Sequence, residues 1–263
     1  MKKTIPAINV LVPVLIMTVA AAHAHAQNAA PTARPPMPKP DATDQWTPVP
    51  PVVSVPASTG IPSDAIVLFD GSSLNGWEST DRNNHTPRWT LEPASRAVVV
   101  APGAGDLRTK AAFGDVQLHI EWRSPAVVKG NSQGRGNSGV FLMDTYELQV
   151  LDSYNNNTYV NGQAGAIYKQ SAPLVNPCRK PGEWNTYDIL FTAPRFKEDG
   201  RLDYPARITV IFNGVVVQNN FTILGPTLNA GVPRYEKAYT GGPILLQDHK
   251  NAVSFRNIWI REL

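Results

Sequence analysis

Polar side chains suited to acid–base chemistry interrupt an apolar segment at residues 146–152, which reads Tyr-Glu-Leu-Gln-Val-Leu-Asp. Successive side chains of a strand point to opposite faces, so Glu147 and Gln149 share one face and the apolar residues between them share the other. A bulge near Leu151 would bring Asp152 onto the polar face as well. Two acids and an amide are costly to bury, so we expect this face to line water or a ligand.

A second apolar segment ends in polar side chains at residues 243–249, which reads Pro-Ile-Leu-Leu-Gln-Asp-His. In a strand, Gln247 and His249 lie on one face and Asp248 on the other. Carboxyl and imidazole groups can move protons, and amides can hydrogen-bond the hydroxyl groups of sugars. Together the two segments predict a site for proton transfer on a hydroxyl-rich ligand.

Glycine-containing loops accompany these segments. Residues 129–136 lead into Asn137 at the start of a strand, and residues 162–165 precede Tyr168 and Lys169. Loops of this kind can close over a groove on a rigid sheet. Asn137, Tyr168 and Lys169 are therefore candidates for contacts with the ligand.

Several other classes of function lack support in the sequence. There is no phosphate-binding P-loop, no dinucleotide-binding glycine motif and no serine-hydrolase elbow, so no organic cofactor is expected. The single cysteine, Cys178, excludes an intrachain disulfide framework and a cysteine-rich zinc site. Lys and Arg total 24 against 21 Asp and Glu, for a net charge of +3. With no long basic run, we expect no nucleic-acid partner.

The pattern that must position these groups is that of β-strands. Apolar and polar residues alternate strictly over residues 116–121, and Asn213-Gly214 lies between two β-branched runs, a strong hairpin signal. No window of twelve residues carries a helical stripe. About ten short strands predict an all-β sandwich or barrel, formed as one domain over residues 64–263.

The N-terminal part differs in character. Lys2 and Lys3 precede an apolar stretch, and Ala24-His25-Ala26 resembles a cleavage site, so residues 1–26 are predicted to be a signal peptide. Proline-rich residues 27–63 are predicted to be an extended linker. We expect a bacterial periplasmic or secreted protein with no membrane contact after cleavage.

A set of motifs, in order along residues 64–263, resembles the 3-keto-disaccharide hydrolase domain family. The motifs are Leu68-Phe69-Asp70-Gly71, Leu74-Asn75-Gly76-Trp77, Asn137-Ser138-Gly139-Val140, the segment 146–152, Gly165-Ala166-Ile167-Tyr168, Gly182-Glu183-Trp184-Asn185-Thr186-Tyr187, Asn213-Gly214-Val215, the segment 242–249 and Phe255-Arg256-Asn257-Ile258-Trp259-Ile260. One departure is Lys250, which stands where the family usually has glycine.

The resemblance implies a concanavalin A-like jelly-roll sandwich of two curved antiparallel sheets with a concave sugar groove. It also implies action on glycosides oxidised to a ketone at C3, with an oligosaccharide or glycoside as substrate. Such a ketone acidifies the hydrogen on C2, so a base can remove it and the C1 substituent can leave. Water can then add, which gives net hydrolysis. Either Glu147 or His249 is a candidate for the base.

Asp152 has two predicted roles: to orient His249, or to complete a divalent-metal site with Glu147. Glu147, Asp152 and His249 are accordingly the candidates for catalysis and for metal ligation, and a metal would stabilise the enolate as a Lewis acid. The candidates for substrate binding are Asn137, Gln149, Tyr168, Lys169, Gln247 and Arg256. The alternatives are sheet-pairing amides for the two glutamines, and partnership with a carboxylate for Arg256.

Two other functions stay open at this stage. One is a carbohydrate-binding module without turnover. The other is a conventional glycosidase or polysaccharide lyase, since a retaining glycosidase needs two carboxyls about 5–5.5 Å apart and the first segment offers Glu147 and Asp152. However, Gln149 stands where concanavalin A-like retaining glucanases tend to carry a helper Asp. The sequence makes no prediction of oligomeric state.

Overall fold

The computed structural model describes residues 37 and 39–263. The predicted signal peptide lies outside the described residues. The chain divides into two compact units, 1–51 and 52–263, and the described part of the first contains one short 3-10 helix, η1 (Pro40–Thr43). Residues 52–63, expected to be linker, belong to the second unit, where the Ser63 amide donates to the Ser54 carbonyl at 2.9 Å.

The second unit is built from short strands. They are β1 (Ile66–Phe69), β2 (Trp77–Ser79), β3 (Thr90–Glu92), β4 (Ala97–Val99), β5 (Leu107–Thr109), β6 (Val116–Arg123), β7 (Ser138–Leu142), β8 (Tyr146–Val150), β9 (Asn185–Thr192), β10 (Arg195–Phe196), β11 (Leu202–Tyr204), β12 (Arg207–Phe212), β13 (Val215–Thr222), β14 (Leu245–Leu246) and β15 (Ser254–Glu262). The 3-10 helices η2 (Pro93–Ser95), η3 (Ser132–Gly134) and η4 (Val160–Gly162) lie between them. The described residues contain no α-helix and no helix long and apolar enough to cross a membrane.

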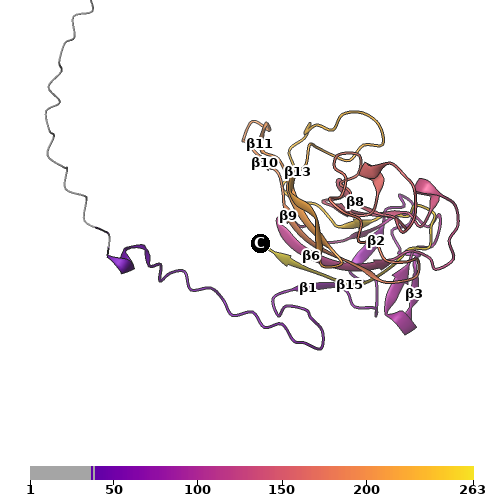
Figure 1. The fold of residues 1–263 in the computed structure, drawn as a ribbon, viewed down its shortest axis with the longest axis horizontal. Helices are drawn as coiled ribbons and strands as arrows, with labels where there is room; N and C mark the ends of the chain where they lie inside the picture. The colour runs from indigo at the N-terminus through magenta and orange to yellow at the C-terminus, as the bar shows by residue number, and fades with distance from the viewer. Residues whose placement is uncertain (1–36, 38) are drawn as a thin grey trace, which may run out of the picture. The chain divides into compact units, whose positions relative to one another are not determined.

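The strands form two main sheets. One has eight strands in the order β13-β12-β9-β6-β15-β4-β3, with β1 also paired to β15, and the other has five in the order β2-β5-β14-β7-β8. All strand pairs are antiparallel, and β10 and β11 form a separate ribbon. In Figure 1 the eight-stranded sheet curves as one layer through β13, β9, β6 and β15. The predicted all-β fold with two antiparallel sheets is confirmed.

Local sequence accounts for the strands that the pattern predicted. Side chains of β6 alternate between buried and half-buried along its whole length, so one face meets the core and the other faces outward. The predicted hairpin joins β12 to β13, and its two turn residues, Asn213 and Gly214, have φ of +50° and +82°. Asparagine and glycine tolerate this left-handed region best, which explains why they occur at the turn.

Strand β8 differs from β6 because all five of its residues are buried. Tyr146, Leu148 and Val150 belong to the core between the sheets. Alternation therefore turns Glu147 and Gln149 to the other face of the five-stranded sheet, where they are also buried. A strand covered on both faces needs a second layer, and loops supply it here.

Candidate active site

A cavity of about 350 Å³ lies on this face of the five-stranded sheet, between the sheet and its covering loops. Its lining residues are Gln133, Asn137, Phe141, Glu147, Gln149, Tyr168, Thr227, Asn229, Gln247 and His249. Six of the predicted site residues are among them: Asn137, Glu147, Gln149, Tyr168, Gln247 and His249. The structure thus brings together most of the polar groups that the sequence singled out.

The two polar segments meet because both flank β7. Within the sheet, Gly139 of β7 pairs with Gln149 of β8. On the other side of β7, the backbone N–H of Gln247 donates to the Gly139 carbonyl at 3.0 Å. Gln149, Gly139 and Gln247 therefore form one row across the sheet, although about a hundred residues separate the two glutamines.

Tyr168 reaches the cavity through the free edge of β8. The backbone N–H of Gln149 donates to the Ala166 carbonyl at 3.0 Å, and the backbone N–H of Gly165 donates to the backbone carbonyl of Gln149 at 3.1 Å. The Tyr168 amide donates to the Glu147 carbonyl at 3.1 Å. The glycine-containing loop thus adds an irregular strand to the sheet edge and sets the tyrosine next to the buried acid.

Gly139 provides the space that Glu147 occupies. A Cβ atom on Gly139 would lie 2.8 Å from Oε1 of Glu147 and 2.8 Å from Cε2 of Phe141. Real Cβ atoms essentially never approach other atoms below 3.0 Å. The carboxyl therefore lies directly over the glycine, and any larger residue would displace it.

Burial changes the acidity of Glu147, whose exposed fraction is only 6%. It raises the pKa of this carboxyl to about 8, and no charge or hydrogen bond from the described residues counters the shift. Burial, the hydrogen bond between Tyr168 and Tyr159, and the charge of Glu147 also raise the pKa of Tyr168. The free protein thus holds Glu147 largely protonated at neutral pH, as suits a general acid.

Three amide oxygens of the cavity are buried without a hydrogen-bond partner among the described residues: Asn137 Oδ1, Gln149 Oε1 and Gln247 Oε1. Buried polar atoms are nearly always paired in folded proteins. An oxygen of this kind accepts a hydrogen bond and does not donate one. The cavity therefore presents acceptors to whatever ligand occupies it.

His249 is an exposed residue of the lining, as is Asn229, and it follows β14 into the last hairpin. In this turn Lys250 adopts φ of +62°, in the region that glycine favours, which agrees with the glycine expected there. The Asp248 carboxylate accepts a hydrogen bond from the Lys250 amide at 2.9 Å and another from the Gly105 amide at 3.1 Å. Asp248 therefore stabilises the turn that presents His249.

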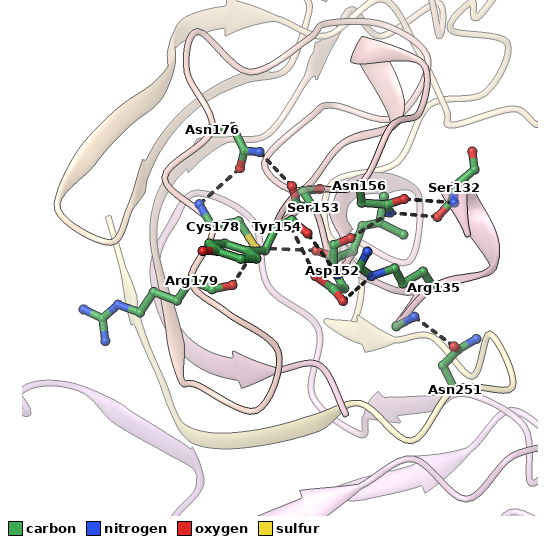
Figure 2. Close-up of polar contacts among 12 residues, drawn as sticks. Ser132, Arg135, Asp152, Ser153, Tyr154, Asn156, Asn176, Cys178, Arg179 and Asn251 are labelled. Carbon is green, nitrogen blue, oxygen red and sulfur yellow. Dashed lines mark hydrogen bonds and ion pairs between the residues drawn. The ribbon is translucent and has the colours of Figure 1, made fainter. Parts of the chain in front are cut away.

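The structure does not bring Asp152 into the cavity. Its carboxylate, 2% exposed, accepts from Arg135 Nε at 2.6 Å and from the Tyr154 amide at 3.2 Å, as Figure 2 shows. The Asp152 amide donates to the Gly136 carbonyl at 3.1 Å, which holds the chain in this position just after β8. Asp152 thus contacts neither Glu147 nor His249 and serves the loop that carries Arg135.

The predicted metal site is not formed by these residues. Within residues 39–263 no three His, Cys, Asp or Glu side chains lie close enough to hold a metal ion. Glu147 and His249 lack the third ligand that Asp152 was expected to supply. These three residues therefore do not fit a metal ion.

Two of the predicted substrate contacts also lie elsewhere. Lys169 Nζ donates to both the carbonyl and the Oδ1 atom of Asn229, so this lysine acts on the cavity through a lining residue. Arg256 is on the eight-stranded sheet, where its Nε donates to Glu121 at 2.7 Å and its guanidinium lies 4.1 Å from the Trp184 ring centroid. Of the two roles expected for Arg256, substrate contact or partnership with a carboxylate, the structure contains the second.

Four lining residues were not predicted from the sequence: Gln133, Phe141, Thr227 and Asn229. Gln133 lies in the loop already expected to close over the groove. Its side-chain amide is the one feature of the sequence that could have identified it as a lining residue. Thr227 and Asn229 come from a loop without a pattern. This loop reaches the site because the Glu147 amide donates to Thr227 Oγ1 at 2.9 Å and the Thr227 amide donates to the Thr145 carbonyl at 3.0 Å.

Comparison with known proteins agrees with this architecture. Residues 64–261 match the family model described as the 3-keto-alpha-glucoside-1,2-lyase-like domain. The chain belongs to this family. It is 27% identical over 251 residues to the 3-keto-disaccharide hydrolase of Bacteroides thetaiotaomicron, an alignment that covers 78% of this chain and 82% of that protein.

Solved structures extend the comparison. A "putative glycosyl hydrolase" from Parabacteroides distasonis is 52% identical, with a TM-score of 0.79 over 86% of this chain and 97% of that one. A second protein of the same description and organism is 22% identical, with a TM-score of 0.55 over 76% and 94%, and shows the fold alone. The predicted glycoside hydrolase-like enzyme is confirmed.

Proposed function

We propose that this enzyme cleaves glycosides whose sugar ring carries a ketone at C3, by removing the C2 proton and eliminating the C1 substituent. The observation that carries the proposal is the cavity itself, which places the buried Glu147 carboxyl and the His249 imidazole among amide acceptors. The names of the family and of the Bacteroides relative support a 3-keto saccharide as substrate.

In the proposed reaction His249 takes the C2 proton, because an imidazole can act as a base near neutral pH. The electrons of the C2–H bond form an enolate and then the C1–C2 double bond, while the C1–O bond breaks. Glu147 donates its proton to the departing oxygen. Later addition of water across the double bond gives net hydrolysis, and the redox-neutral sequence calls for no organic cofactor.

The enolate oxygen needs hydrogen-bond donors in its vicinity. The Asn229 amide has its oxygen engaged by Lys169, which leaves its nitrogen available to donate. Thr227 and Tyr168 also line the cavity, and each carries a hydroxyl group. These three groups come from the covering loops, whereas the acid comes from the sheet.

Aglycone release from a 3-keto-glucoside and from its unoxidised parent tests the proposal. We expect release from the keto sugar alone, and its collapse in Glu147→Gln. Release from the parent would favour a conventional glycosidase. Binding of sugar without release from either would favour a carbohydrate-binding module.

We also propose that the enzyme works in the periplasm or outside the cell. The basis is the N-terminal pattern of Lys2 and Lys3, an apolar stretch and Ala24-His25-Ala26. Sequencing the N-terminus of protein recovered from the periplasmic or culture fraction should find Gln27 first. Recovery of the full chain from the cytoplasmic fraction alone would contradict the proposal.

A further inference from the structure

The partnerless amide oxygens of Asn137, Gln149 and Gln247 form an acceptor wall on one side of the cavity. Across the described residues, the one other buried side-chain polar atom without a partner is Trp122 Nε1, which belongs to the core between the sheets. Asn137 is 3% exposed and Gln149 1%, so neither oxygen is exposed to open solvent. Their grouping in one cavity points to a ligand that supplies hydrogens.

Gln133 sets the orientation of two of these three amides, those of Asn137 and Gln149. Asn137 Nδ2 donates to the backbone carbonyl of Gln133 at 2.7 Å, and Gln149 Nε2 donates to the side-chain oxygen Gln133 Oε1 at 3.0 Å. Gln133 Nε2 is itself held by Thr158 Oγ1 and by the Gly162 carbonyl, both at 2.9 Å. Rotating the side-chain amide of Asn137 or Gln149 by half a turn would bring its oxygen against an oxygen of Gln133. The network therefore selects one orientation for each amide.

The charge of the lining is consistent with this wall. No Lys or Arg is among the residues that line the cavity, and the one carboxyl there is Glu147. A uronate or sulfate group would meet acceptor oxygens without a cation to compensate it. A neutral ring with free hydroxyl groups can satisfy all three oxygens.

We infer that Gln133 is a positioning residue that makes the Asn137 and Gln149 part of this wall acceptor-only, and that the cavity thereby selects neutral sugar rings that direct hydroxyl hydrogens at Asn137, Gln149 and Gln247. The inference deepens the proposed function and rests on it for the identity of the ring. A ketone has no hydrogen to donate, so the C3 oxygen must point away from the wall. The donors of Thr227, Asn229 and Tyr168 are the groups left to receive it.

Binding measurements on the full mature chain test this without turnover. The probes are methyl α-glucoside, its single deoxyfluoro analogues at C2, C3, C4 and C6, and methyl α-glucuronoside, with the dissociation constant measured by calorimetry. Fluorine replaces a hydroxyl of similar size but cannot donate. We expect binding to weaken about 3–10-fold at each position that faces the wall, and more than 10-fold for the glucuronoside.

Gln133→Met keeps the length of the side chain and removes the amide. We expect it to bind the parent about tenfold more weakly and to lose discrimination between hydroxyl and fluorine at the same positions. The matched control is Gln117→Met, whose amide oxygen accepts from Arg261 far from the cavity. A merely structural role would weaken all ligands alike and leave discrimination intact.

Three outcomes would overturn the inference. They are equal binding of hydroxyl and fluoro analogues to the wild type, no binding of any neutral sugar in the panel, and unchanged discrimination in a folded Gln133→Met variant. If the panel behaves as expected but no 3-keto-glucoside is cleaved, the acceptor wall stands and the proposed reaction fails.

Discussion

Replacing Gly139 by alanine tests whether the placement of Glu147 sets the rate. The added Cβ would lie 2.8 Å from Oε1 of Glu147, where ordinary contact begins at 3.4 Å, so the carboxyl must move by about 0.6 Å. The ring of Phe141 blocks the other direction at 2.8 Å. A misplacement of 1 Å can lower a rate about 100-fold, so we expect kcat/KM to fall roughly 10- to 20-fold.

The same substitution should have a modest effect on stability. Overpacking by one methyl group typically costs about 1–3 kcal/mol, and each kcal/mol lowers Tm by roughly 2–4 °C in a domain of this size. The assay is aglycone release from a 3-keto-glucoside, with Tm from a thermal melt. Gly76→Ala is the matched control, because nothing lies within 4 Å of its added Cβ. Wild-type kcat/KM in a folded Gly139→Ala variant would refute the reasoning.

Four further predictions follow from the same contacts. Glu147→Gln should lower kcat by about 10²–10⁴-fold with no loss in Tm, since it removes a buried ionisable group; intact turnover would exclude Glu147 as acid or base. Because burial raises the pKa of Glu147 to about 8, kcat/KM should fall as pH rises through 8, whereas a rise there would make Glu147 the base. Burial alone would lower the pKa of His119, but the hydrogen bond to Asp188 raises it to about 9. After allowance for screening at the partly exposed Asp188, this pair should add about 2 kcal/mol to the free energy of unfolding below pH 6.5. The contribution should be lost as pH rises through 9. A plot of the free energy of unfolding against pH should lack it in His119→Gln. Asp152→Asn should lower the free energy of unfolding by about 3–5 kcal/mol, because it leaves Arg135 without its buried partner, and kcat of the folded fraction should stay within a few-fold of wild type.

Strand periodicity and turn chemistry are local properties, and the sequence reports them directly. The alternation in β6 and the Asn213-Gly214 turn predicted a strand and a hairpin that the structure contains. The polar face of residues 146–150 was predicted for the same reason, since a period of two depends on no other part of the chain. The ordered motifs then indicated the family.

Tertiary structure decided which of these groups meet. Gln247 joins Gln149 only because β14 and β8 flank the same strand, and this strand order cannot be read from local alternation. Asp152 shares a segment with Glu147 yet pairs with Arg135, because backbone contacts after β8 turn it out of the cavity. Arg256 belongs to the other sheet for the same kind of reason.

Loop packing decided the rest. Gln133, Thr227 and Asn229 are placed by hydrogen bonds to distant segments, and polar loop residues carry no periodic signal that would reveal this. The raised pKa of Glu147 also has a tertiary origin, because desolvation depends on what covers the carboxyl. By itself the sequence determined the strands and the chemical types available to the site. Only the folded sheet and its loops decided which of them share one cavity, since those contacts join residues far apart in the chain.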